Sequence, residues 1–317
     1  MMKKLFLPLL VFLLLCSGCG CSQPELSLHN LFEQADSSPP VFLSASMQSQ
    51  HTATLGFNES IAENSVALWC EQNSVASFTV IDKTLTLNLA KPLQMGTSLP
   101  LEGRVEDIRG NSLQFSIELW AKNTHPATVL INEFTTKGSE TNPDRVELVV
   151  TSRGNLAGLT LYAGVADDWS DRFVFPDRWV ERGTYVVVAF SKGEHEAAWY
   201  TSALQAGLGS NNGCLSVAIS PEWTSPLLDA VMWGNMSTST FEGFGSASLL
   251  SQAQILFQNG QWNSASSEKS IDSNTGTATR SVCRDRLIDT NSSDDWYGCA
   301  TRQATFGSKN SELRYTP

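Results

Sequence analysis

Two glutamates in neighbouring apolar runs are the first residues whose type and spacing could support chemistry. Glu133 lies in VLINEF and Glu147 in RVELVV, and both runs are typical of β-strands. Carboxylates on adjacent strands can lie close enough to act as an acid and a base. An active site also needs partner groups within reach, and no histidine base, oxyanion-hole motif or metal cluster accompanies these two. We therefore interpret both as structural and predict that the chain is not an enzyme. A hydrolase that uses one of them, or the Asp289–Asp295 loop, is the alternative.

Two further segments contain residues that ligate ions in other proteins. The segment Asp289–Asp295, DTNSSDD, has oxygen ligands at alternate positions, as calcium loops do. Its sixth place holds Asp294 instead of glycine, and its twelfth holds Ala300 instead of glutamate. These departures favour a turn that bonds its own amides, and calcium binding is the alternative. GLGSNNG, residues 207–213, precedes a strand-like run, whereas a phosphate-binding loop precedes a helix. No motif therefore predicts a cofactor or a metal.

The chain has seven cysteines, and their spacing limits what they can do. Cys283 and Cys299 lie in one short C-terminal segment, close enough to staple a hairpin, so we predict a disulfide between them. Closing a loop of this length would stabilise the fold by about 3 kcal/mol. No C-x-x-C occurs, and no cysteine–histidine spacing suits zinc. Cys70 and Cys214 have no obvious partner and are predicted to be buried thiols.

The N-terminus predicts an exported, lipid-anchored protein. In MMKKLFLPLLVFLLLCSGCGCS two lysines precede an apolar run that is too short to span a membrane comfortably. Small residues leading to cysteine follow, and this order resembles a bacterial lipoprotein signal. Cys19 is the best acylation site because Ser17 and Gly18 supply the small residues before the cut. Residues 1–18 are thus a predicted signal peptide and residues 19–40 a polar, lipidated tether. A plain secretory peptide is the alternative.

The charge of the chain disfavours one class of partner. The formal net charge is −11, and a form beginning at Cys19 would be −13, because the removed segment has two lysines and no acid. An acidic surface repels phosphate backbones, and no cluster of lysine and arginine offsets this locally. We predict that the chain does not bind nucleic acid. The predicted location is the cell envelope, with the lipid anchor in a bacterial membrane, at the outer membrane or cell surface.

Residues 41–122 predict a first all-β domain. Seven short runs rich in apolar and β-branched residues are separated by turn segments, a spacing typical of a β-sandwich. Its pieces LGFNESIAENSV and TLTLNLAKPLQMGTSLPLEGRVEDIRGN resemble the bacterial Ig-like domain of the S-layer-protein type. The resemblance implies a spacer or adhesion module.

Residues 128–311 predict a second sandwich, after the linker KNTHPA. The runs VLINEF, RVELVV, LTLYAG, RFVFP and TYVVVAF follow one another, each bounded by Gly, Asn, Asp, Pro or Ser. Their order resembles the lamin-tail domain (LTD), an Ig-like β-sandwich of nuclear lamins and many exported bacterial proteins. The match includes Ile131–Phe134, the corner at Asn155–Leu161 and the closing D-T-N…D-W at Asp289–Trp296. The predicted fold class is therefore all-β, with two Ig-like β-sandwiches in tandem.

The resemblance and the composition add two expectations for this second region. Arg280 falls on the matched arginine of the closing pattern, and we predict that it pairs with Glu147 or Glu133. The planar fork of arginine suits such a pair, which would tie the C-terminal strand to the opening strands. The polar stretch from Gly234 to Gly276 predicts surface loop with little regular structure.

The tryptophans suggest how such a protein would act. Seven of the nine lie in the second region, several of them in predicted loops. Exposed aromatic residues on loops bind proteins or sugars, although tryptophan is also a common core residue of sandwiches. The sequence thus predicts a non-enzymatic lipoprotein that binds or positions an extracellular or envelope protein. A carbohydrate-binding module that uses the loop tryptophans is the alternative.

Overall fold

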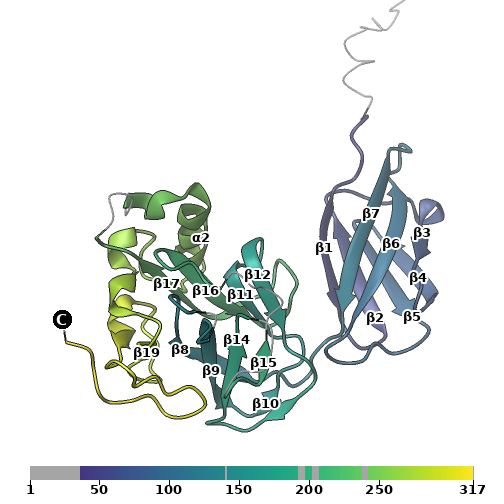
Figure 1. Cartoon of the computed structure of the whole chain (residues 1–317). Helices are drawn as coiled ribbons and strands as arrows, with labels where there is room; N and C mark the ends of the chain where they lie inside the picture. The colour runs from purple at the N-terminus through teal and green to yellow at the C-terminus, as the bar shows by residue number, and fades with distance from the viewer. Residues whose placement is uncertain (1–35, 140, 192–196, 202–206, 238–241, 317) are drawn as a thin grey trace, which may run out of the picture. The chain divides into compact units, whose positions relative to one another are not determined.

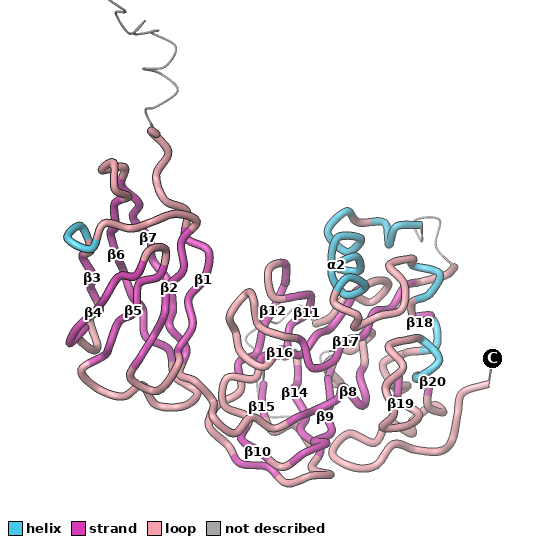
Figure 2. The backbone as a smooth tube through the Cα atoms, turned by 180° about the vertical axis from the view of Figure 1, so that it is seen from behind, coloured by secondary structure: helices cyan, strands magenta, loops and turns pink. Residues whose placement is uncertain are grey.

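The computed structural model describes residues 36–316 apart from 140, 192–196, 202–206 and 238–241. Residues 42–120 form a first sandwich of two antiparallel sheets (Figure 1, Figure 2). One sheet has the strand order β1-β2-β5-β4 and the other the order β3-β6-β7. The strands are β1 (Phe42–Met47), β2 (Thr52–Phe57), β3 (Ala67–Trp69), β4 (Val75–Ile81), β5 (Thr84–Leu89), β6 (Ser98–Glu106) and β7 (Ser112–Trp120), with the 3-10 turn η1 (Glu63–Ser65).

Alternation of apolar and polar residues explains this first sandwich. Every second side chain of β2 and β5 is buried, and Leu55 and Leu87 have no exposed surface. In β6, Leu101 and Val105 are buried while Glu102 is exposed. Successive side chains of a strand point to opposite faces, so this period places the leucines between the sheets. The seven strands predicted from the sequence are all present.

The second sandwich combines two larger sheets. One has the strand order β15-β14-β9-β8-β19-β20 and the other the order β12-β11-β16-β17-β18. Neighbouring strands are antiparallel except for the parallel pairs β14–β15 and β17–β18. The strands are β8 (Thr128–Phe134), β9 (Arg145–Ser152), β10 (Gly154–Asn155), β11 (Thr160–Val165), β12 (Asp168–Val174), β13 (Trp179–Val180), β14 (Tyr185–Ala189), β15 (Tyr200–Thr201), β16 (Gly213–Ala218), β17 (Leu227–Gly234), β18 (Ile271–Asp272), β19 (Val282–Arg284) and β20 (Trp296–Gly298).

Continuous apolar runs explain the central strands of this second sandwich. The valines of TYVVVAF fall in β14, and Val186, Val187 and Val188 have no exposed surface. A strand that is buried on both faces needs no polar alternation. The hydrophobic cluster here draws its buried members from residues 127–296, and that of the first sandwich from residues 47–121. The predicted all-β sandwich fold is confirmed.

One segment differs from its prediction. The stretch from Gly234 to Gly276 contains the α-helix α2 (Ala247–Gln258), which packs against β11 and β16, together with η2 (Glu242–Gly245), η3 (Ser267–Lys269), β18 and η4 (Ser273–Thr275). The loop prediction was wrong because Ser246 caps the helix by accepting from the backbone N–H of Leu249, while Ala253 and Leu256 bury one face. In the described part of the chain, no helix has both the length and the apolar character needed to cross a membrane.

Candidate functional site

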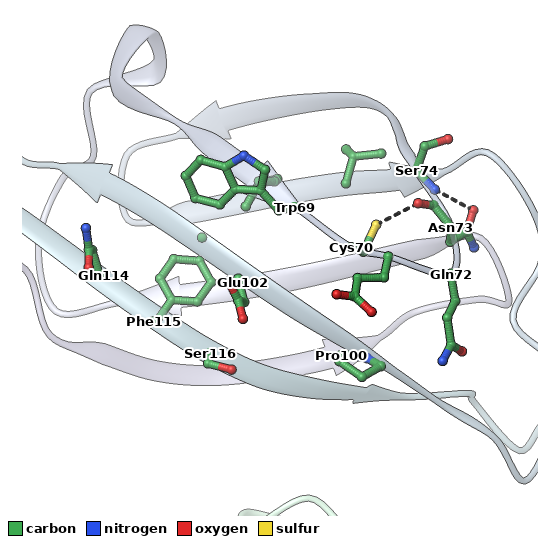
Figure 3. A pocket seen from close by; sticks show the side chains of 14 residues that line it. Trp69, Cys70, Gln72, Asn73, Ser74, Pro100, Glu102, Gln114, Phe115 and Ser116 are labelled. Atoms are coloured by element: carbon green, nitrogen blue, oxygen red, sulfur yellow. Dashed lines mark hydrogen bonds between the residues drawn. The ribbon is translucent and has the colours of Figure 1, made fainter.

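An open groove lies on the first sandwich beside the edge strand β3 (Figure 3). Its volume is about 1270 Å³, and strands β3, β6 and β7 and the loop 70–74 line it. Trp69 of β3 is 56% exposed at this groove. Figure 3 labels Trp69 and Phe115, from two different strands, among the side chains that line it. A hollow of this size can hold a small molecule or a short chain segment.

Strand register places polar side chains in line with this tryptophan. Trp69 lies opposite Glu102 of β6, and Glu102 lies opposite Ser116 of β7. Residues directly opposite one another project from the same face of a sheet, so an indole, a carboxylate and a hydroxyl form one row. Gln114, two residues before Ser116, adds an amide on this face. An aromatic face with hydrogen-bonding groups beside it suits a sugar ring, which has both apolar faces and hydroxyls.

Gly103 makes room for Phe115 on the inner face of this sheet, behind the row that begins at Trp69. A Cβ atom at this position would lie 2.3 Å from the ring of Phe115, so only glycine leaves room for the ring. Phe115 is fixed from its other side by Phe42, with ring centroids 5.6 Å apart. Cys70, predicted to be buried, is half-buried at the rim, and its thiol donates to the carbonyl of Asn73 over 3.2 Å. Desolvation by burial raises the pKa of this thiol, so it is not activated as a nucleophile.

Six of the seven tryptophans of the second sandwich form a core group and a surface group, and Trp199 is partly buried against the core. Those in the core are Trp233, Trp262 and Trp296, exposed by 1%, 1% and 9%. Those on the surface are Trp169, Trp179 and Trp223, exposed by 41%, 53% and 57%. The guanidinium of Arg172 lies 5.0 Å from the ring of Trp169, a distance that permits a cation–π contact. The surface group leaves aromatic area exposed to solvent.

The structure brings Glu133 and Glu147 together, as their positions in consecutive strands predicted. Glu133 of β8 lies opposite Glu147 of β9, and on its other side it lies opposite Cys283 of β19. Cys283 in turn lies opposite Tyr297 of β20. These four side chains form one row across four strands. C-terminal residues 305–310 provide hydrogen bonds to this row and to β8.

Neither glutamate has exposed surface, and protein groups occupy both. Glu133 accepts from the Ser281 hydroxyl, from the Thr305 backbone N–H (2.9 Å) and from the Thr305 hydroxyl (3.0 Å). Glu147 accepts from the Asn132 side chain (2.6 Å) and from the Gly307 backbone N–H. Desolvation by burial raises the pKa of Glu147 to about 8, and the charge of Glu133 also raises it. The two hydrogen bonds to Glu147 lower this pKa but do not offset the burial. This arrangement anchors the C-terminal segment to β8 and β9.

The predicted disulfide is not formed, because Cys283 and Cys299 are both free, buried thiols. Cys283 lies opposite Tyr297 in the strand register, and the backbone N–H of Cys299 donates to the carbonyl of Ser281, two residues before Cys283. The two cysteines are therefore diagonal neighbours on one face of the sheet. Diagonal residues stand farther apart than the short Cβ separation that a disulfide requires. The hydrogen bond from the Cys283 thiol lowers the pKa of Cys299 to about 6, and hydrogen bonds from Ser281 lower it further. The same thiol–thiol hydrogen bond raises the pKa of Cys283.

The predicted pairing of Arg280 with either glutamate is also not found. Its guanidinium lies 3.6 Å from the ring centroid of Tyr315, and its Nε has no hydrogen-bond partner among the described residues. The reason is its position, because Arg280 precedes β19 and its side chain does not belong to the row on that strand. The C-terminal strand is instead tied by Arg284, which sequence reasoning missed.

Arg284 forms a buried ion pair in this sandwich. Its Nη2 donates to Asp229 of β17 over 2.6 Å, its Nε donates to the carbonyl of Ile131 over 2.7 Å, and its Nη1 donates to Asp289 over 3.0 Å. Asp229 also accepts from the backbone N–H of Ile131, at the irregularity where the β8–β9 register shifts. Burial raises the pKa of Asp229 to about 7, although Arg284 opposes the shift. One guanidinium thereby links β8, β17 and β19.

The remaining sequence candidates serve local structure. Asp295 accepts from the backbone N–H and the hydroxyl of Thr290, and with the N-cap Ser292 it forms a capping box on η5 (Ser293–Asp295), in agreement with a self-bonding turn. The segment GLGSNNG leads into β16, in agreement with the strand-like run predicted after it. The backbone N–H of Leu208, in this segment, donates to the buried carboxylate of Asp144. Cys19, the predicted signal peptide and the tether up to residue 35 lie outside the described residues, so acylation stays a prediction.

Comparison with known proteins gives one match. A family model described as "protein second domain" matches residues 127–207 and 199–298, which together span more than half of the chain. The matched ranges cover the second sandwich from β8 to β20. No curated protein matches the chain, and no solved structure does.

Proposed function

The chain belongs to the "protein second domain" family, whose description names no activity, and we propose that it is a non-enzymatic, lipid-anchored envelope protein that binds or positions an extracellular protein. In this proposal Cys19 is acylated and residues 19–40 are the tether. The first sandwich acts as an Ig-like spacer, and the second presents a lamin-tail-type surface. The lipoprotein-like N-terminal sequence supports export and anchoring.

The observation that carries the proposal is the exposure of Trp169, Trp179 and Trp223 on the second sandwich. A tryptophan buries about 150 to 250 Å² when it is covered, so a half-exposed one leaves roughly 100 Å² uncovered. Covering that area contributes about 2.5 kcal/mol at 25 cal/mol per Å². Tryptophans are also enriched among the residues that dominate binding energy at protein interfaces. Three such side chains on one small domain supply the anchors that a protein partner would use.

The hydrolase alternative receives no support from the two glutamates. Glu133 and Glu147 are fully buried, and their oxygens bind the C-terminal segment. A general acid must reach the proton it transfers, and neither carboxyl is open to a substrate.

A glycan-binding function is the second candidate, and the groove on the first sandwich favours it. The row of Trp69, Glu102 and Ser116 joins an exposed indole to a carboxylate and a hydroxyl. These are the groups that would stack on a sugar ring and bond its hydroxyls. The sequence alternative assigned sugar binding to the loop tryptophans of the second region, whereas this candidate uses the groove beside β3.

The test uses the purified full chain as bait against envelope and host-matrix extracts, together with a glycan array. The protein-binding proposal expects retention of a specific protein, about tenfold or more weaker for Trp179→Ala or Trp223→Ala and unchanged for Trp69→Ala. The glycan candidate expects array signals that Trp69→Ala removes and Trp179→Ala preserves.

A matched control is Ile81→Ala, which removes an aliphatic side chain that is 77% exposed on the first sandwich. It should leave both kinds of binding unchanged. Turnover of a glycan or phosphoester by the wild type, with no retained partner, would refute the proposal.

A further inference from the structure

We propose that Glu133, Cys283 and Cys299 form a buried site for a divalent cation of the zinc class. The three side chains come from β8, β19 and the residue after β20, and none has exposed surface. One carboxylate oxygen and the two sulfur atoms all lie within 4.8 Å of one another. Two thiolates and a carboxylate are a ligand set that suits zinc.

The positions of these atoms need little change to hold an ion. Zinc–sulfur bonds of about 2.3 Å and zinc–oxygen bonds of about 2.0 Å place tetrahedral ligands roughly 3.5 to 3.8 Å apart. The Ser281 hydroxyl contacts all three, lying 3.1 Å from the Cys299 sulfur, 3.6 Å from the Cys283 sulfur and in a hydrogen bond with Glu133. It is a candidate fourth donor because it contacts all three ligands. The backbone N–H of Ser281 also donates to the Cys299 sulfur over 3.3 Å, the kind of second interaction that fixes a ligating thiolate.

The charge balance of the row favours a cation at this point. The hydrogen-bond donors to Glu133 are neutral, a hydroxyl and a backbone N–H of Thr305 and the hydroxyl of Ser281. Glu147, the neighbour on the other side, is a second buried carboxyl. No ion pair to either glutamate is found within the described ranges. A buried carboxylate is costly unless it is paired or binds a metal, and a bound cation would balance this one.

Zinc ligation also explains how free thiols could persist after export. A thiol pair in an oxidising compartment is exposed to disulfide formation. Here the register of β19 and β20 makes the cysteines diagonal neighbours, which disfavours the disulfide but leaves both sulfur atoms aimed at Glu133 and Ser281. The ligands converge only in the folded sandwich, so the ion would join its C-terminal strands and add to its stability.

The test measures zinc in the full chain purified under reducing conditions without chelator. We expect about one zinc per chain, and after its removal we expect cobalt to restore a thiolate-to-cobalt charge-transfer band. Cys299→Ser should lose the zinc and the band. Glu133→Gln, which keeps the shape of the side chain but removes its charge and one acceptor oxygen, should weaken binding at least about tenfold. Cys214→Ser is the matched control, because Cys214 is a buried thiol of the same sandwich that bonds Gln252 instead.

Several outcomes would overturn the site. One is reduced wild type that binds neither zinc nor cobalt. Another is an intact mass two hydrogens below the reduced mass, with a Cys283–Cys299 peptide and no metal. Equal zinc in the wild type and in Glu133→Gln would also reject it, and that variant decides the matter if Cys299→Ser fails to fold.

Discussion

Replacing Arg284 by methionine should strongly destabilise the second sandwich while leaving the first intact. The guanidinium is 1% exposed and its partner Asp229 is 0% exposed, so the pair is fully desolvated. Methionine fills much of the volume but leaves the Asp229 carboxylate without its cation and the Ile131 carbonyl without its donor. Breaking a buried pair from one side costs about 3 to 5 kcal/mol. Loss of the cation–π contact with Trp296, 4.6 Å away, adds to that.

Hydrogen exchange read by mass spectrometry can measure this effect separately in each sandwich. Because 1.4 kcal/mol corresponds to tenfold in an equilibrium constant, protection of β8, β17 and β19 should fall by roughly one hundred- to three thousand-fold. Peptides of β2 and β5 serve as an internal control and should exchange as in the wild type. The matched substitution Arg314→Met removes an arginine whose pair with Asp285 is 55% and 30% exposed, and it should cost less than about 1 kcal/mol.

The pH dependence gives this prediction a second readout. Burial raises the pKa of Asp229 to about 7 with Arg284 present, and removing Arg284 raises it further. Between the pKa of Asp229 in the unfolded chain and its raised pKa in the folded variant, only the folded variant holds this proton. The stability of the variant therefore falls as the pH rises between these two pKa values. The deficit of Arg284→Met should therefore grow above pH 7. Restoration of stability in the double variant Arg284→Met/Asp229→Leu would agree with a desolvated pair. A cost no larger than that of Arg314→Met would refute the reasoning.

Three further expectations follow from individual contacts. The pKa of Glu147 is raised to about 8, so the folded state keeps a proton that the unfolded state loses. The free energy of unfolding should therefore fall by roughly 1.4 kcal/mol per pH unit between pH 5 and 8. Urea denaturation across this range measures the fall, which Glu147→Gln should abolish. Ser246→Ala removes the cap of α2 and should cost about 1 kcal/mol, seen as faster exchange in 247–258 with unchanged β16. Asn155→Ala should cost about 2 kcal/mol in thermal unfolding, because its buried amide joins Ala157, Arg178 and Asp177.

The strands could be predicted because each carries its own pattern. The alternation in β2 and β5 and the apolar run of β14 are local properties, and burial follows directly from them. The corner at Asn155 was also readable, since a buried asparagine followed by Gly158 at φ +80° makes the turn by itself.

The helix α2 was missed although its signals were in the sequence. Ser246 stands at the N-cap, Gly260 has φ +69° just beyond the C-terminal end, and neither glycine nor proline interrupts ASLLSQAQILFQ. The serines and glutamines of the surrounding stretch gave a loop-like composition over the whole interval. The spacing of apolar residues within these twelve residues decides whether the segment folds as a helix, and the composition of the forty residues around it does not.

The candidate site could not be read from spacing, because the residues that meet there are distant in sequence. Glu133 and Ser281 are 148 positions apart, and Arg284 and Asp229 are 55 apart. Arg280 lies before β19 and Arg284 is its last residue, so the position of this strand decides which arginine enters the sandwich. A shift of one residue exchanges the two faces of a strand. The register of β8, β19 and β20 therefore determines three outcomes together: Arg284 reaches Asp229, the cysteines become diagonal neighbours, and Glu133 faces both sulfur atoms.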